Sequence, residues 1–106
     1  MARASAGESV ADSVPPVHAG VYGAFARHLA TRPPHTRNAY LRDVAQLLAL
    51  ADETPPRSIS RAQLSRFLAT LHGRGLSGRS LARMLSAWRA FFHYLCLLYT
   101  SPSPRD

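Results

Sequence analysis

The sequence has one cysteine, no long hydrophobic run and no secretory signal, and each of these features excludes a class of protein. The single cysteine, Cys96, excludes an internal disulfide framework and a metal site built of cysteines alone. The longest apolar run, residues 91–99, is interrupted by His93 and is far below the roughly 18 residues of a membrane span. The first sixteen residues lack the apolar segment of a secretory signal. We therefore expect a cytoplasmic protein that does not enter a membrane.

The chain is short, and its apolar residues repeat at helical spacing only. Its 106 residues allow one domain of ordinary size, which excludes a large two-domain enzyme within this chain. No segment alternates as a strand does, and no segment is repeated. Apolar residues recur every three or four positions in four segments, which predicts helices over residues 17–31, 34–52, 60–73 and 77–95. The expected fold is all-α, with four short helices packed compactly around one core.

The apolar stripes of these segments define the expected core. Its predicted members are Val17, Val21, Tyr22, Phe25, Leu29, Tyr40, Val44, Leu47, Leu48, Ala51, Leu64, Phe67, Leu68, Leu71, Leu81, Met84, Leu85, Trp88, Phe91, Phe92 and Leu95. On the second helix, four polar residues fall off the stripe and are expected to point away from the core: Arg37, Arg42, Asp43 and Gln46.

Helix ends are marked by their usual residues. Pro34 suits the first turn of a helix, where its missing N–H costs nothing. Ser60 followed by Gln63 is a capping-box pattern, and Gly73 is placed to end that helix. Ser77 can cap the fourth helix. Residues 1–16 are rich in Ala, Ser and Gly without apolar periodicity, so we expect a disordered leader before a domain spanning residues 17–95.

Arginine supplies all thirteen basic residues, against six acidic ones, for a formal net charge of +7. A domain this small and basic is attracted to polyanions. The turn before the fourth helix and the helix itself carry four arginines and no acidic residue: Arg74, Arg79, Arg83 and Arg89. Three hypotheses remain open for this face, namely a solvated surface produced by codon bias, a binding site for phosphate groups, and a docking site for an acidic protein.

Other chemistry is sparse. Four histidines fall on different predicted elements without ligand spacing, so no metal site is expected: His28, His35, His72 and His93. Cys96 has no evident histidine partner for a nucleophile. The chain contains no glycine-rich phosphate loop and no pair of carboxylates for acid–base catalysis. The sequence therefore predicts no cofactor, no metal and no small-molecule substrate.

Two long segments resemble a known family of DNA-binding domains. They are PHTRNAYLRDVAQLLAL (34–50) and SISRAQLSRFLATLHGRGLSGRSLARMLSAWRAFFHYL (58–95), with a weaker match at FARHL (25–29). They resemble the N-terminal core-binding, SAM-like domain of tyrosine recombinases, closest to the XerC/XerD type. The resemblance covers about two thirds of the chain.

The resemblance implies a helical domain that clamps one face of duplex DNA with its second and fourth helices. Carried over by position, it assigns DNA contacts to His35, Thr36, Arg37, Tyr40, Ser77, Arg79, Ser80 and Arg83. Arg74 and Arg89 join them on the charge pattern alone. The further partners implied for the full-length protein are sister recombinase subunits.

The resemblance places catalysis in a separate C-terminal domain, where a tyrosine nucleophile acts with arginine, lysine and histidine groups. No tyrosine of this chain stands in such a motif, so no catalytic residue is assigned to it and no strand cleavage is expected. In full length, the family cuts and rejoins DNA and in bacteria resolves chromosome dimers at division. A phage or integron-type integrase sharing the domain is the first alternative, and a basic helical adaptor that docks an acidic protein is the second.

The family would continue into a linker after Leu95, whereas this chain reads CLLYTSPSPRD (96–106). This ending resembles a translated sequencing-adapter tail. We therefore expect residues 96–106 to be foreign to the domain or unstructured, and the chain to be a truncated fragment.

Overall fold

The structure is a computed structural model, which describes residues 14–99. Within this range four α-helices follow one another: α1 (Ala19–His28), α2 (Pro34–Ala51), α3 (Arg61–Gly73) and α4 (Gly78–Tyr99). Single 3₁₀ turns, η2 (Pro16–His18) and η3 (Pro56–Ser58), precede α1 and α3. The predicted all-α, four-helix fold is confirmed.

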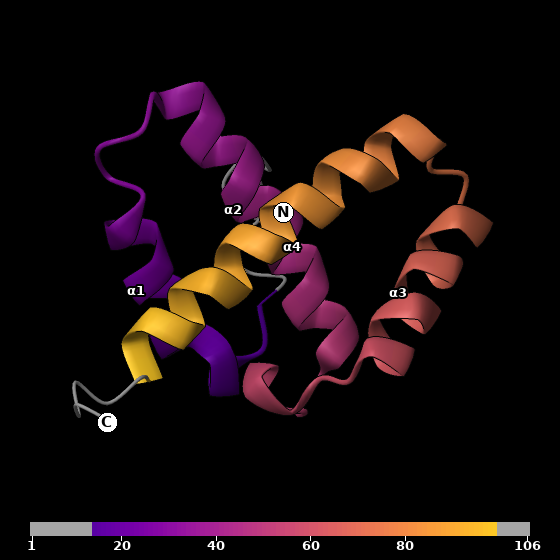
Figure 1. Cartoon of the computed structure of the whole chain (residues 1–106), viewed down its shortest axis with the longest axis horizontal. Helices are drawn as coiled ribbons and strands as arrows, with labels where there is room; N and C mark the ends of the chain where they lie inside the picture. Colours follow the sequence, from indigo (N-terminus) through magenta and orange to yellow (C-terminus); the bar gives the residue numbers. More distant parts are fainter. Residues whose placement is uncertain (1–13, 100–106) are drawn as a thin grey trace, which may run out of the picture.

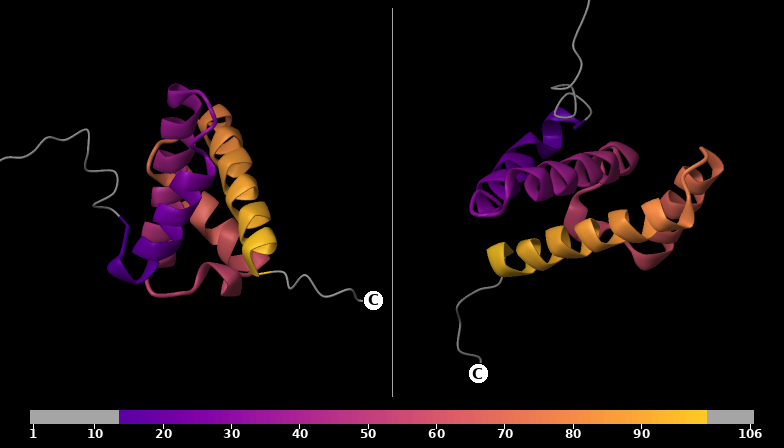
Figure 2. Two further views of the ribbon diagram at one scale, coloured as in Figure 1. Left: turned by 90° about the vertical axis from the view of Figure 1, so that its left-hand side faces the viewer. Right: turned by 90° about the horizontal axis from the view of Figure 1, so that it is seen from above.

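Helices α2 and α4 form the centre of the molecule. They cross near its middle and make the largest contact between any two of the described elements (Figure 1). Both helices begin at the upper edge in Figure 1 and descend toward opposite lower sides. α1 packs on α2, and α3 packs on α4. Seen from above, in the right-hand view of Figure 2, α1 and α2 lie together in one layer and α4 lies beside them in a second layer.

The buried core is gathered around this crossing. Trp88, Phe25 and Phe91 are its largest fully buried side chains. Phe25 of α1 meets Phe91 of α4 edge to face, with ring centroids 5.1 Å apart and planes inclined by 77°, which is a favoured aromatic geometry. The buried apolar residues that pack into one cluster are Val14, Phe25, Leu29, Val44, Ala45, Leu47, Leu48, Leu71, Met84, Trp88, Phe91 and Leu95.

Both predicted N-caps form. The backbone N–H of Gln63 donates to Ser60 Oγ at 3.1 Å, and the backbone N–H of Ser60 donates to Gln63 Oε1 at 2.9 Å, which completes the capping box of α3. The backbone N–H of Ser80 donates to Ser77 Oγ at 3.1 Å at the start of α4. Each bond satisfies an amide that has no partner within its helix.

The end of α3 corrects one prediction, because Gly75 rather than Gly73 reverses the chain. Gly73 is the last helical residue, and Gly75 has a φ of +103°. The amide of Leu76 donates to the Leu71 carbonyl at 3.2 Å, and that of Gly75 donates to the His72 carbonyl at 3.0 Å. This pair of bonds defines a Schellman motif with glycine at the position that needs a positive φ.

The start of the domain also differs from the prediction. The helix begins at Ala19, after a 3₁₀ turn that two prolines initiate, and it ends at His28. The tighter turn directs Val14 and His18 inward and leaves Val17, an expected core residue, 66% exposed. The ring Nε2 of His18 donates to the carbonyl oxygen of Asp52 at 2.6 Å. Val14 therefore belongs to the domain rather than to the leader, and residues 1–13 lie outside the described range.

The fourth helix continues four residues beyond the expected boundary at Leu95, to Tyr99. Cys96, Leu97 and Leu98 lie in this last turn and are exposed. The rest of the expected tail, residues 100–106, lies outside the described range. In the described part of the chain, no helix has the length and apolar character needed to cross a bilayer.

Candidate nucleic-acid interface

The predicted site residues of α2 lie in its first two turns. His35 is exposed, whereas Thr36, Arg37 and Tyr40 are half-buried. At about 100° per residue, Thr36 lies about 20° around the helix from Asp43, which is seven residues on, and Arg37 lies about 120° from Asp43. Thr36 therefore shares the side of α2 that carries Asp43, and Arg37 lies on another side.

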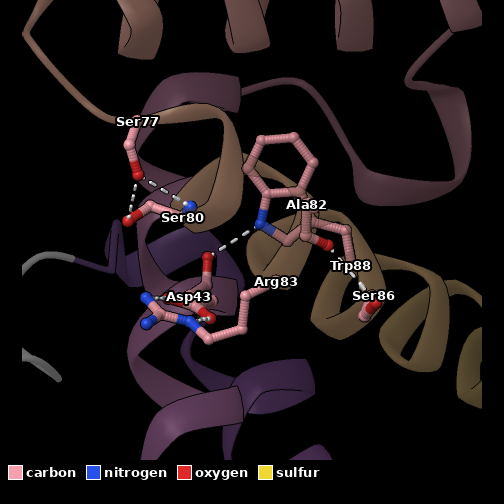
Figure 3. Close-up of polar contacts among 7 residues, drawn as sticks. All are labelled: Asp43, Ser77, Ser80, Ala82, Arg83, Ser86 and Trp88. Carbon is pink, nitrogen blue, oxygen red and sulfur yellow. Dashed lines mark hydrogen bonds and ion pairs between the residues drawn. The ribbon is translucent and has the colours of Figure 1, made fainter.

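The predicted residues of α4 lie at its N-terminal end. Ser77 precedes the helix as its cap, and its hydroxyl donates to Ser80 Oγ at 3.2 Å (Figure 3). Arg79 and Arg83 follow on the exposed side, about 40° apart around the axis. The first turn contains no acidic residue. The positive end of the helix dipole therefore adds to the charge of Arg79.

Arg89 does not join this group. It lies about 120° around α4 from Arg83 and lines a hollow of about 390 Å³ between α3 and α4, together with Arg61 and Phe92. Arg74 is the exposed C-cap residue of α3, in the turn that leads to α4. The two arginines nominated on charge alone therefore flank the N-terminal group of α4 rather than extend it.

The structure shows that Arg83 forms an ion pair with Asp43 across the crossing of α2 and α4. Arg83 Nε donates to Asp43 Oδ2 at 3.4 Å, and Nη2 donates to Oδ1 at 3.5 Å (Figure 3). The Arg83 side chain is 56% exposed, whereas that of Asp43 is 2% exposed. The expectation that Asp43 points away from the core was wrong, because this side of α2 is covered by α4.

A third hydrogen bond, from Trp88, fixes the backbone of Asp43. The indole Nε1–H of Trp88 donates to the backbone carbonyl of Asp43 at 2.9 Å, and this bond is buried. Trp88 was predicted as a core residue, and it is fully buried. The three bonds hold Asp43 against α4 by both its backbone and its side chain (Figure 3).

Burial raises the pKa of Asp43 above its ordinary value of 3.8, because the ionised carboxylate is desolvated. The hydrogen bond and the positive charge of Arg83 oppose this effect, and the charge of Arg42 opposes it to a smaller extent. Arg42 is exposed on α2, seven residues after His35 and therefore about 20° from it around the helix.

Sequence reasoning missed Asp43 and Arg42 as members of the site. One signal was present for Asp43, which follows Tyr40 by three residues and precedes Leu47 by four. This spacing places Asp43 at the border of the apolar stripe. Which helix covers this border depends on how α2 and α4 cross. The spacing of residues within α2 alone does not predict that crossing.

Comparison with known proteins gives a consistent result over most of the chain. Residues 24–97 match the family described as "Phage integrase, N-terminal SAM-like domain". The chain is similar to tyrosine recombinase XerC of Chromobacterium violaceum, with 47% identity over 73 residues that make up 67% of this chain and 24% of that protein. It is also similar to tyrosine recombinase XerC of Ralstonia pickettii, with 43% identity over 77 residues that make up 69% of this chain and 23% of that protein.

A third relative, tyrosine recombinase XerC of Neisseria meningitidis serogroup B, is 41% identical over 75 residues, which make up 65% of this chain and 25% of that protein. The chain thus spans about a quarter of the length of these curated relatives. No solved structure matches this chain.

Proposed function

The chain belongs to the family of phage integrase N-terminal SAM-like domains, and from this premise we propose that it binds duplex DNA as the core-binding domain of a XerC-type tyrosine recombinase. The observation that carries the proposal is the exposure of basic residues on the two crossing helices, in the first two turns of α4 and in the first half of α2. Arg79 and Arg83 of α4 and His35 and Arg42 of α2 are all exposed. Guanidinium groups so placed suit the phosphate oxygens and base edges of a duplex.

The full-length protein, in this proposal, cuts and rejoins DNA and resolves chromosome dimers, with sister recombinase subunits on the same DNA. The relatives support this assignment, because the Chromobacterium, Ralstonia and Neisseria proteins are all XerC recombinases. They favour the XerC type over a mobile-element integrase. The SAM-like domain contributes the grip on DNA, and strand exchange belongs to the rest of the recombinase.

A competition experiment separates DNA binding from attraction to any polyanion. The chain is bound to a short fluorescent duplex, and anisotropy is followed as unlabelled duplex or poly-L-glutamate of equal total charge is added. We expect the duplex to displace the probe at much lower concentration, because only the duplex presents phosphates and base edges in the spacing of a groove. Equal displacement by poly-L-glutamate would instead support a docking site for an acidic protein.

A further inference from the structure

The Asp43–Arg83 pair joins an almost fully buried carboxylate to a guanidinium that is more than half exposed. Replacement of a buried ion pair by apolar residues of similar volume is often neutral or stabilising, so such a pair is weak evidence for stability alone. The pair also lies at the N-terminal half of α4, within the proposed DNA-binding surface. A role in DNA recognition accounts both for the burial of Asp43 and for the exposure of Arg83.

The geometry divides the donors of Arg83 between two edges. A guanidinium has five N–H donors in a fixed plane. The edge formed by Nε and Nη2 faces the Asp43 carboxylate, with contacts of 3.4 and 3.5 Å. The outer edge, formed by the remaining hydrogens of Nη1 and Nη2, is left for another partner. This outer edge is a planar pair of donors, as required for a bidentate contact with O6 and N7 of guanine.

A buried hydrogen bond fixes the backbone of Asp43, so its carboxylate supports Arg83 from a fixed position. Trp88 is fully buried and donates to the Asp43 carbonyl at 2.9 Å. The carboxylate therefore holds the plane of Arg83 from a fixed point of the helix crossing, rather than from a mobile surface side chain. Fixing a long side chain before binding reduces the rotamer entropy that is lost when the contact forms.

The charge of the pair distinguishes Arg83 from Arg79. The positive charge of an arginine and the negative charge of its carboxylate partner nearly cancel. Such a pair therefore adds little to the general attraction for phosphates. For Arg79, which is exposed on the first turn of α4, the structure gives no acidic partner among the described residues. Arg79 suits phosphate neutralisation, whereas the paired Arg83 suits a contact that depends on donor geometry.

We propose that Asp43 is a positioning residue that presents the outer edge of Arg83 to a guanine in the major groove, so that this pair reads a base while Arg79 binds phosphate. The proposal rests on the proposed DNA binding and deepens it. It assigns sequence discrimination to one ion pair of the α2–α4 crossing.

The test uses the complete chain and a pool of short duplexes of random sequence, from which bound molecules are recovered and sequenced. We expect the pool to show a preferred guanine at one position at least. Changing this guanine to adenine in a fixed duplex should weaken binding of the unchanged chain by about 5- to 150-fold. Asp43→Asn should abolish most of this ratio while leaving binding to the adenine duplex equal or stronger, because the substitution removes one negative charge. A purely structural role for Asp43 would instead weaken both duplexes together.

Two further variants complete the design. Arg83→Gln removes the guanidinium but leaves an amide that can still donate to the buried Asp43 carboxylate, so once urea unfolding shows that it is folded it tests the base contact independently of Asp43→Asn, and it should lose the preference for guanine. Arg79→Ala is the matched control, which should weaken binding to both duplexes while keeping their ratio. Retention of the guanine preference by Arg83→Gln or by folded Asp43→Asn would overturn the proposal, as would salt-dependent binding of the unchanged chain with no base preference. Failure of the unchanged chain to bind any duplex would overturn the proposed function itself.

Discussion

A carboxylate buried at a helix crossing costs free energy unless a partner offsets the loss of its hydration. Asp43 has this partner in Arg83, but the two contacts of 3.4 and 3.5 Å are long for charged groups. Desolvation therefore outweighs the attraction, and the pKa of Asp43 is raised. The raised pKa should be measurable as a pH dependence of the free energy of unfolding.

The sign of the pH dependence follows from the raised pKa. The folded chain holds the Asp43 proton more tightly than the unfolded chain does, so stability from this group is fully present below the ordinary pKa of 3.8 and is lost as pH rises through the raised pKa. We expect the free energy of unfolding of the unchanged chain, minus that of Asp43→Asn, to be largest at low pH and to fall as pH rises.

Urea unfolding of both proteins over a series of pH values measures this difference, since the other titrating groups are common to both. The groups that act on Asp43 are Arg83 from α4 and Arg42 from α2, and both stay charged throughout. A difference that grows as pH rises would mean that the ion pair lowers the pKa of Asp43 and that desolvation is the weaker of the two effects.

At the scale of elements, the sequence allowed the helices and their N-caps to be predicted because these depend on local spacing. Ser60, Gln63 and Ser77 act within a single turn, and the structure has them as predicted. Two of the predictions that failed have different physical causes, one local and one from packing between helices. Val17 is exposed because Pro15 and Pro16 start a 3₁₀ turn instead of an α-helix, and Asp43 is buried because α4 crosses over it.

For the candidate interface, the positions of residues around a single helix were predictable from the sequence, whereas contacts between helices were not. Arg79 and Arg83 were placed on one exposed side of a helix, and they lie there. The pairing of Arg83 with Asp43 was not predicted. It depends on which neighbouring helix covers that side of α2, and helical periodicity alone contains no information on that packing.

Two glycines at the end of α3 provide a test of the corrected helix end. A Cβ on Gly75 would meet no atom within 4 Å, but its φ of +103° disfavours any L side chain. We expect Gly75→Ala to lower the free energy of unfolding by about 1–2 kcal/mol. Thermal or urea unfolding measures the change.

Gly73→Ala is the matched control, because Gly73 is helical and also has open space around its Cβ position. It should leave stability unchanged or raise it by about 0.5 kcal/mol. A larger loss for Gly73→Ala than for Gly75→Ala would restore Gly73 as the residue that reverses the chain.

At the scale of the whole molecule, a domain of this size buries only about 60% of the surface of its unfolded chain, so its stability is expected to be marginal. Three of its tyrosines contribute to packing: Tyr22, Tyr40 and Tyr94. The Tyr22 hydroxyl donates to the Leu41 carbonyl at 3.3 Å, and burial raises its pKa. Tyr40 and Tyr94 are half-buried against the core.

We therefore expect the 106-residue chain to bind DNA without forming a covalent bond to it. A tyrosine must lose its proton to attack a phosphodiester, and the environment of Tyr22 opposes that loss, since burial raises its pKa. The measurement uses a labelled duplex with a nick that traps phosphotyrosyl products, followed by denaturing electrophoresis. A labelled band that migrates with the protein after denaturation would refute this expectation.

The salt dependence of duplex binding tests the central claim most directly. If the basic residues of the α2–α4 surface other than the paired Arg83 together neutralise about four phosphates, the logarithm of the binding constant should fall with the logarithm of salt concentration at a slope of roughly −4. Arg79→Ala should reduce the magnitude of this slope by about one. Arg27→Ala, which removes an exposed arginine of α1 outside the proposed surface, should leave it unchanged. Equal changes for the two variants, or a slope near zero for the unchanged chain, would contradict a DNA-binding surface formed by α2 and α4.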